Sequence, residues 1–303
     1  MNWIKKSLFA KLLIGALLTV MLPLTISNII SYKSNYAAVK KQILDLNIGA
    51  IHMGMQELKD CVDEWQQIAL TIYSSDIIYF LSSREPFTAV QRYYIYEELE
   101  TMCLSAQEIQ AVVYDSLPNG DSLYYSKSDF EVNQVNRSDL SPIISGYNHA
   151  LSSILDEETG QTTSVLFRHA ISNVPGYDNL GTLTIFLRPD KLGNISDALI
   201  DQSPDSAVFI YAGAAAIPLF TSGPLSQDMP DLTDIPSDGN VPAQLNDHKG
   251  ILIVYKEIYK GVPLSLVKFI PETVINTSAT STLRNALLIQ LFTIPFILLL
   301  VLV

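Results

Sequence analysis

Two apolar runs without a charged residue lie near the two ends of the chain, at residues 12–31 and 286–303. A helix needs about 20 apolar residues to cross the ~30 Å hydrocarbon core of a bilayer, and both runs are close to this length. Three lysines precede the first run, and short cationic flanks stay in the cytoplasm. The pattern therefore predicts a cytoplasmic segment at residues 1–11 and two transmembrane helices.

A cleaved signal peptide is the alternative interpretation of the first run. Its apolar region would hold about 7–15 residues and would precede a cleavage site between small residues. The run is longer than this, and Thr25–Asn28 offers no such site. We therefore expect an uncleaved anchor. The chain ends inside the second run, so we also expect it to be a piece of a longer protein.

Helical spacing dominates the segment after the first run. From Tyr32 to Leu81 apolar residues such as Leu58 and Val62 recur every three to four positions, which predicts a long helix that continues from the span. Ser82–Pro86 ends this helix, because it combines polar residues with a proline. A second helix is predicted at Ala89–Ser105.

The spacing becomes that of β-strands after residue 108, where short apolar runs alternate with turn residues. Pro118–Asp121 is a strong turn between two such runs and predicts a hairpin. Residues 141–156 are predicted to form a loop and a short helix, and Pro189–Leu199 a helix. The strands of this first group are expected at Ile109–Asp115, Leu123–Tyr125, Thr163–Ser172 and Gly181–Arg188.

A second group of strands repeats this order. Ser222–His248 is rich in Pro, Asp, Gly and Ser and is predicted to be a loop, while Pro271–Arg284 is predicted to be a polar helix. The strands are expected at Ser206–Ala212, Ile217–Thr221, Gly250–Ile258 and Val262–Ile270. The expected fold class is α+β: a long N-terminal helix and two antiparallel-sheet units in series, flanked by two transmembrane helices.

The charge distribution narrows the choice of partner. The net charge is −12, and all 31 acidic residues lie between the two apolar runs. Such an acidic surface argues against nucleic acid or anionic lipid as the partner of residues 32–285. The chain is expected to start in the cytoplasm and to cross the membrane once through the first span. Residues 32–285 are therefore expected to be extracytoplasmic.

The sequence contains no recognisable enzyme or metal motif. A GxSxG motif, a P-loop and a dinucleotide-binding glycine motif are all missing, and the four histidines are scattered. Cys61 and Cys103 lie in helical patterns, where packing explains them better than a disulfide does. We expect no catalytic residue, no cofactor and no metal in this chain.

Three stretches carry a resemblance to a known family. They are IKKSLFAKLLIGALLTVMLPLTISNIISY, LNIGAIHMGMQELKDCVDEWQQIALTIYSSDIIYFL and GVPLSLVKFIPETVI. In the order of its segments and in these short sequence stretches, the chain resembles the N-terminal region of YesM-type sensor histidine kinases of Gram-positive bacteria. The resemblance implies a double Cache (tandem PAS-like) sensor domain at residues 32–285, with a membrane-distal unit at about 82–189 and a membrane-proximal unit at about 200–271.

The resemblance also implies a function. The chain would be the sensor part of a two-component kinase in the cell membrane, and would detect an extracellular small molecule, such as a carbohydrate, or a solute-binding protein. A homodimer and a response regulator are implied partners. The phosphoacceptor would follow the second span, because all four histidines (His52, His149, His169 and His248) lie outside the cytoplasm. The alternatives are the sensor of a membrane-anchored AraC-type regulator and an anchored surface binding protein that does not signal.

Domains of this type usually hold their ligand over the sheet of the outer unit, where aromatic side chains supply contact area and Arg and Asp orient a polar ligand. Amino-acid-binding Cache domains carry an Arg-x-Trp-Tyr motif with a downstream Asp. Gln91–Tyr94 comes near this motif but lacks the Trp and that Asp, so an amino-acid ligand is not favoured. The candidate ligand-binding residues are Tyr114, Asp115, Tyr124, Tyr125, Arg168, His169 and Tyr177.

Overall fold

The computed structural model of the chain divides into two compact units, one made of Met1–Ile48 with Pro271–Val303 and the other of Gly49–Ile270. In the first helix, side chains are described at residues 15, 19, 22 and 23 and from residue 25 onward. The described residues are 2–74, 76–127, 130, 132, 148–156, 159–172, 179–200, 206–213, 218–223, 230, 238–245, 247–277, 280, 284 and 288.

The second predicted span lies almost wholly outside the described residues, and the first has part of its side chains outside them. Residues 286–303 are described only at Leu288, and in the first span the side chains of residues 12–14, 16–18, 20, 21 and 24 are not described. Within the described part of the chain, no helix has a stretch that is both long and apolar enough to cross a membrane. Residues 272–277 are helical, which agrees with the start of the polar helix predicted at Pro271–Arg284.

The long helix ends earlier than its apolar spacing predicts. Helix α1 runs over Asn2–Leu70, and a 3₁₀-helix at Thr71–Ser74 follows it. The Thr71 hydroxyl donates a hydrogen bond to the carbonyl oxygen of Ile68 at 2.7 Å. Such local bonds compete with a continued α-helix, so the prediction of one helix to Leu81 is wrong. Further helices of the described residues are α2 at Ile78–Leu81 and, as predicted, α3 at Ala89–Ser105 and α4 at Asp190–Leu199.

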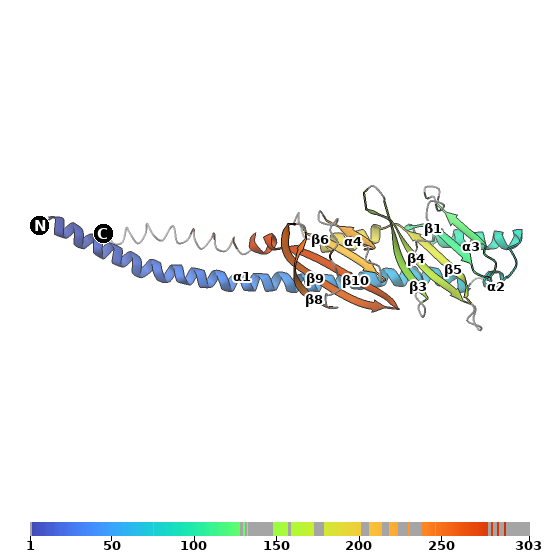
Figure 1. The fold of residues 1–303 in the computed structure, drawn as a ribbon, viewed down its shortest axis with the longest axis horizontal. Coiled ribbons are helices and arrows are strands. Elements are labelled where there is room, and N and C mark those ends of the chain that lie inside the picture. Colours follow the sequence, from blue (N-terminus) through green and yellow to red (C-terminus); the bar gives the residue numbers. More distant parts are fainter. Residues whose placement is uncertain are drawn as a thin grey trace. The chain divides into compact units, whose positions relative to one another are not determined.

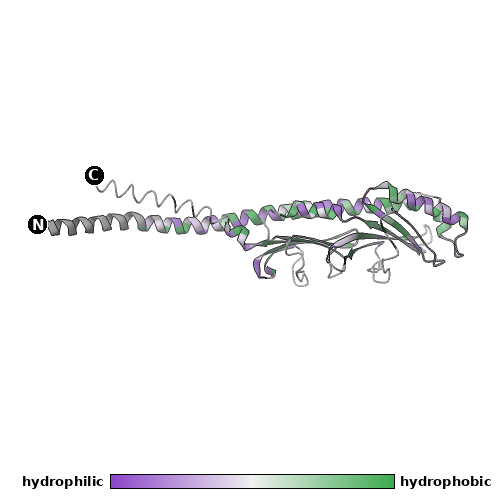
Figure 2. Ribbon diagram, turned by 90° about the horizontal axis from the view of Figure 1, so that it is seen from above, coloured by the Kyte–Doolittle hydropathy of each residue, from purple (hydrophilic) through white to green (hydrophobic). Residues whose placement is uncertain are grey.

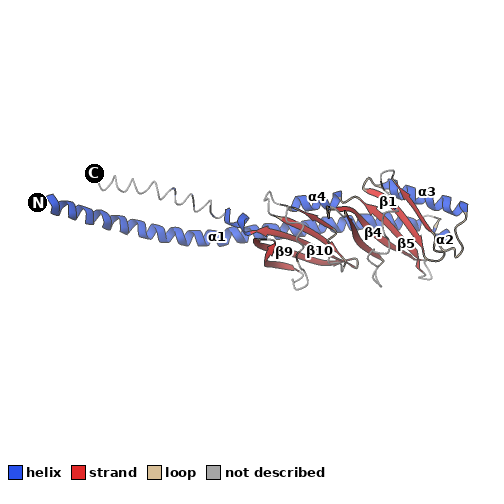
Figure 3. Cartoon of the chain, turned by 45° about the horizontal axis from the view of Figure 1, so that its top comes forward, coloured by secondary structure: helices blue, strands red, loops and turns tan. Residues whose placement is uncertain are grey.

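The described strands form two five-stranded antiparallel sheets (Figures 1 and 3), which confirms the predicted α+β architecture. Sheet A contains β1 (Ile109–Ser116), β2 (Ser122–Ser126), β3 (His149–Leu155), β4 (Thr162–Ser172) and β5 (Asn179–Leu187). Sheet B contains β6 (Ala207–Ala212), β7 (Phe220–Ser222), β8 (Asp238–Leu245), β9 (His248–Tyr259) and β10 (Val262–Pro271). The orders are β2-β1-β5-β4-β3 and β7-β6-β10-β9-β8, so sheet B repeats sheet A strand for strand.

Two edge strands correct the sequence analysis. Strand β3 lies within residues 141–156, which were expected to be a loop and a short helix, and β8 lies within the loop expected at Ser222–His248. The β8 sequence DGNVPAQL contains Asp, Gly and Pro, which disfavour strands. An edge strand tolerates them, because among the described strands β8 has a neighbour, β9, on one side only. Pairing with β4 and β9, rather than local sequence, makes these segments strands.

Helix α1 covers the same side of both sheets (Figure 2). The ring of Trp65 lies 6.4 Å from that of Phe167 on β4, between centroids. At Gly54 the helix comes so close to sheet B that an added Cβ would lie 3.1 Å from Cδ2 of Leu266 on β10. The fully buried residues of this helix include Leu58, Val62 and Ala69.

The opposite faces of the two sheets differ in how far apolar side chains fill them. On sheet B this face carries one apolar cluster made of Ala207, Phe209, Tyr211, Leu245, Leu252, Val254, Val267 and Phe269. On sheet A the corresponding cluster is smaller and is made of Ala111, Val113, Val132, Leu166 and Phe186. The remaining part of this face of sheet A is polar, and it contains the candidate site.

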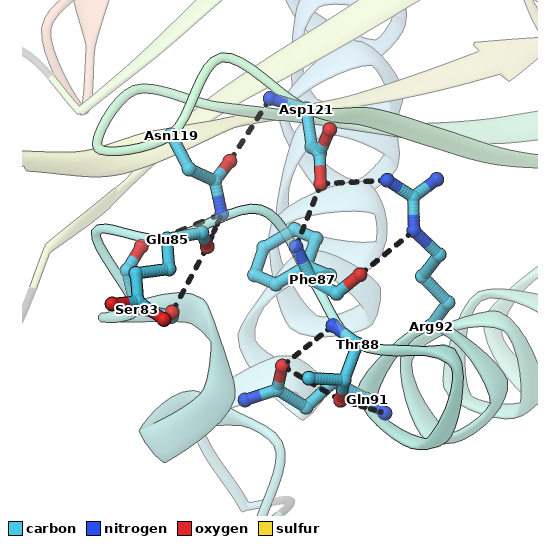
Figure 4. Close-up of polar contacts among 8 residues, drawn as sticks. All are labelled: Ser83, Glu85, Phe87, Thr88, Gln91, Arg92, Asn119 and Asp121. Atoms are coloured by element: carbon cyan, nitrogen blue, oxygen red, sulfur yellow. Dashed lines mark hydrogen bonds and ion pairs between the residues drawn. The ribbon is translucent and has the colours of Figure 1, made fainter.

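Polar contacts fasten the segment between α2 and α3 to the β1–β2 turn (Figure 4). Asp121 accepts hydrogen bonds from the backbone N–H of Phe87 and from the guanidinium of Arg92, both at 2.9 Å. The amide of Asn119 donates to the carbonyl oxygen of Glu85 at 3.0 Å. These bonds hold the end of sheet A at which β1 stops and β2 begins.

Replacing Asp121 with alanine should lower the free energy of unfolding by about 1–2 kcal/mol, because a charge-assisted bond is lost and the Phe87 N–H loses its partner. Denaturant titration followed by circular dichroism measures this. The exposed Asp76 offers a control, since Asp76→Ala should change stability by less than about 0.5 kcal/mol. Equal losses in both variants would contradict a fastening role for Asp121.

Candidate functional site

Three of the candidate residues lie together on the face of sheet A opposite α1. Asp115 on β1 pairs with Thr182 on β5, and Arg168 on β4 pairs with Thr184. Tyr124 on β2 belongs to the same cross-strand row as Thr184 and Arg168. Directly paired residues present their side chains on one face. Asp115, Tyr124 and Arg168 therefore surround two threonines of the central strand.

Short side chains lie beside the two charged residues. Ala170 pairs with Thr182, Ala150 pairs with Arg168, and Ser122 pairs with Asp115. The apolar part of the same face instead carries bulky residues, including Leu166 and Phe186. A ligand with hydrogen-bonding groups is therefore favoured over the part of the face that holds Asp115 and Arg168.

The site combines a cation and an anion on either side of β5. Burial lowers the pKa of the half-buried Arg168 guanidinium, and the attraction of the Asp115 carboxylate opposes this effect. The Ser122 hydroxyl donates a hydrogen bond to Oδ1 of Asp115 at 2.7 Å. This arrangement can bind complementary charges of a small ligand, or several hydroxyl groups.

Sequence reasoning missed four polar residues of this face: Ser122, Ser152, Thr182 and Thr184. Ser152 on β3 pairs with Leu166, and its buried hydroxyl oxygen has no hydrogen-bond partner. Thr182 and Thr184 alternate with Leu183 and Ile185 in the sequence TLTI, which is the period-2 pattern of a strand with one polar face. That alternation is the signal that could have found them.

The structure does not bring the other candidates to this face. The buried Tyr114 donates a hydrogen bond to the carbonyl oxygen of Leu180 at 2.7 Å, and burial raises the pKa of its phenol to about 12. The ring of Tyr125 lies 5.4 Å from that of Tyr96 on α3. His169 lies on the α1 side of the sheet, like Phe167 two residues before it. Tyr177 lies outside the described residues.

The near-match to the amino-acid motif has a structural use. Arg92, the arginine within Gln91–Tyr94, pairs with Asp121 and donates through Nε to the carbonyl oxygen of Phe87 at 3.0 Å (Figure 4). Its side chain is therefore engaged in fastening α3 to the β1–β2 turn.

The described residues include potential metal ligands and the two cysteines of the chain. They contain no group of three or more His, Cys, Asp or Glu that could hold a metal ion. Cys61 and Cys103 are free thiols. Burial raises the pKa of Cys61 to about 11, which keeps this thiol protonated and unreactive at neutral pH.

The fold of the chain is similar to that of solved ligand-binding domains of chemoreceptors. No family model and no curated protein matches the chain. The ligand-binding domain of the Pseudomonas fluorescens chemoreceptor CtaA, solved with L-isoleucine, matches with a TM-score of 0.51 at 15% identity, over 80% of this chain and 98% of that chain. The ligand-binding domain of the Campylobacter jejuni chemoreceptor Tlp3, solved with L-valine, matches with a TM-score of 0.51 at 11% identity, over 80% and 97%. The chain therefore has the double Cache-like fold of chemoreceptor ligand-binding domains.

Proposed function

We propose that residues 32–285 are the extracytoplasmic sensor domain of a membrane receptor. Residues 12–31 and 286–303 would be its transmembrane helices and residues 1–11 its cytoplasmic start. The domain binds a small polar molecule on the face of sheet A opposite α1. The placement of Asp115 and Arg168 on either side of Thr182 and Thr184 carries this proposal. The likeness to domains solved with bound ligands supports it.

Sheet A is a better ligand site than sheet B for a physical reason. The corresponding face of sheet B holds eight buried apolar residues, among them Phe209 and Phe269. A polar ligand would lose its hydration there without gaining hydrogen bonds. On sheet A, Asp115 and Arg168 can replace the lost water with charge-assisted bonds.

Two ligand classes fit the charge pattern. A zwitterion would set its carboxylate against Arg168 and its ammonium group against Asp115. Amino acids of this kind are bound in the CtaA and Tlp3 structures. A carbohydrate would use the same groups and the hydroxyls of Ser122, Thr182 and Thr184. It would also stack on Tyr124, whose side chain is 40% exposed.

Titration calorimetry of the chain against isoleucine, valine and a set of mono- and disaccharides tests the site. We expect Arg168→Gln and Asp115→Asn each to weaken binding about 10–100-fold, because each removes one charge-assisted bond. Arg84→Gln and Asp76→Asn remove the same charges from exposed positions and should leave the affinity unchanged. Binding that survives both site variants would contradict this location.

The output proposed for the receptor is a YesM-type histidine kinase that follows the second span, acts as a homodimer and phosphorylates a response regulator. The resemblance of the chain to the N-terminal region of YesM-type kinases supports this proposed output. The coding sequence beyond Val303 separates the alternatives. A HAMP segment, a phosphoacceptor helix and an ATP site would mark a kinase, whereas paired helix-turn-helix motifs would mark an AraC-type regulator. An early stop would leave an anchored binding protein.

A further inference from the structure

Two histidines lie buried together between sheet A and the end of α1. His149 on β3 pairs directly with His169 on β4, and the side chains are 5% and 3% exposed. Their rings are 6.5 Å apart between centroids and are inclined by 24°. Tyr73, in the 3₁₀-helix after α1, stands perpendicular to His169 with the centroids 6.2 Å apart. The Phe167 ring lies 5.7 Å from His149.

The polar atoms of this group are poorly satisfied. Both ring nitrogens of His149, Nδ1 of His169 and Nε1 of Trp65 are buried without a hydrogen-bond partner. The Tyr73 hydroxyl already accepts a bond from the backbone N–H of Ser172 at 3.1 Å. A charged imidazolium has two N–H donors that need acceptors. This environment therefore accommodates the neutral form of each ring and opposes the charged form.

The neighbouring charges act in the same direction. Lys260, in the β9–β10 turn, is the charged group that acts on His149, and it is held at α1 by Asp63 at 2.7 Å and by Gln66 at 2.8 Å. Burial lowers the pKa of both imidazoles. It brings that of His169 to about 4, and the neighbouring His149 contributes to this shift.

We propose that His149 and His169 form a proton-binding site through which external acid weakens the packing of α1 against sheet A. At neutral pH both rings are neutral and the packing is intact. In acid, each ring takes one proton from solvent when the end of α1 moves away and water reaches it. The proton is thus a second input to the sensor, separate from a ligand on the opposite face of the sheet.

The sign of the effect follows from linkage. The pKa of His169 is lowered in the packed state, so the loosened state binds more protons and gains population as the pH falls below about 6.5. With values of 6.5 and about 4 in the two states, His169 alone should raise the ratio of loosened to packed molecules about 30-fold between pH 8 and pH 5.

Trp65 provides a local reporter of this change. The chain has two tryptophans, so Trp3→Phe leaves Trp65 as the single tryptophan, packed on Phe167 beside His149 and excited selectively above the tyrosine absorption band. The full chain in detergent micelles would be titrated from pH 8 to pH 4 while emission and far-UV circular dichroism are recorded. We expect a reversible red shift of Trp65 emission with a midpoint between pH 4 and 6.5 and unchanged helix content.

Variants assign the transition to the two histidines. His149→Phe with His169→Asn should remove it, whereas His52→Asn, at an exposed position of α1, should leave it in place. If the double variant does not fold at pH 8, the single variant His169→Asn is the test. The proposal requires that it reduce the red shift of Trp65 emission in acid. The proposal is overturned if the midpoint is the same without these histidines, or if no shift precedes global unfolding.

Discussion

Gly181→Ala should lower the free energy of unfolding of the protein by more than about 3 kcal/mol. Gly181 lies near the start of β5 and pairs with Ser116 on β1. Its φ of +151° is one that residues with a side chain rarely adopt. An added methyl would overlap the carbonyl oxygen of Asp115 and would lie 2.9 Å from Cε2 and 3.0 Å from Oη of Tyr114. Moving either group costs free energy. The Asp115 backbone belongs to a paired strand, and the Tyr114 hydroxyl donates a hydrogen bond to the carbonyl oxygen of Leu180.

Gly160 supplies the matched control for this prediction. It also has a positive φ of +68°, but no atom lies within 4 Å of an added Cβ. Gly160→Ala should therefore show the backbone cost alone, about 1 kcal/mol. Urea titrations of both variants measure the difference. Similar losses would mean that the close approach of β5 to Asp115 and Tyr114 is relieved at little cost.

Strong local periodicity explains which elements could be predicted from the sequence. The apolar-rich runs of β1 and β10 and the three-to-four spacing of α3 each predict one kind of element, and the structure agrees. Strand β3 carries no such pattern, and in β8 the alternation of Val241, Ala243 and Leu245 is short and is interrupted by Pro242. They are strands because a neighbour offers them hydrogen bonds at the sheet edge, and that information resides in β4 and β9.

Strand alternation also explains why only part of the site could be predicted. Six candidates form three adjacent pairs on strands, and neighbours on a strand face opposite sides of a sheet. Each pair can thus give one residue to a given face. The three members on the face opposite α1 are Asp115, Tyr124 and Arg168. The choice depends on which face α1 covers, and this is a tertiary fact that contacts such as Trp65 with Phe167 reveal.

Trp65→Ala should cost about 3–5 kcal/mol, the range found when a large aromatic side chain is removed from a packed core. Trp65 is 1% exposed and lies where α1 meets Phe167, so its loss leaves a cavity between the helix and sheet A. Gln67→Ala changes an exposed position two residues further along the same helix and should cost less than about 0.5 kcal/mol. Denaturant titration of the two variants measures the contrast.

Trp65→Phe separates the ring packing from the indole N–H. Nε1 of Trp65 is buried without a hydrogen-bond partner, so its removal relieves a desolvation cost while the aromatic contact with Phe167 largely remains. We therefore expect Trp65→Phe to retain most of the stability that Trp65→Ala loses. A phenylalanine variant as unstable as the alanine variant would indicate that the N–H has a partner, such as a buried water. In either case the lost stability arises where α1 packs on β4 through Trp65 and Phe167, and β4 also carries Arg168. We therefore expect a movement of β4 at the proposed ligand site to alter the packing of the helix.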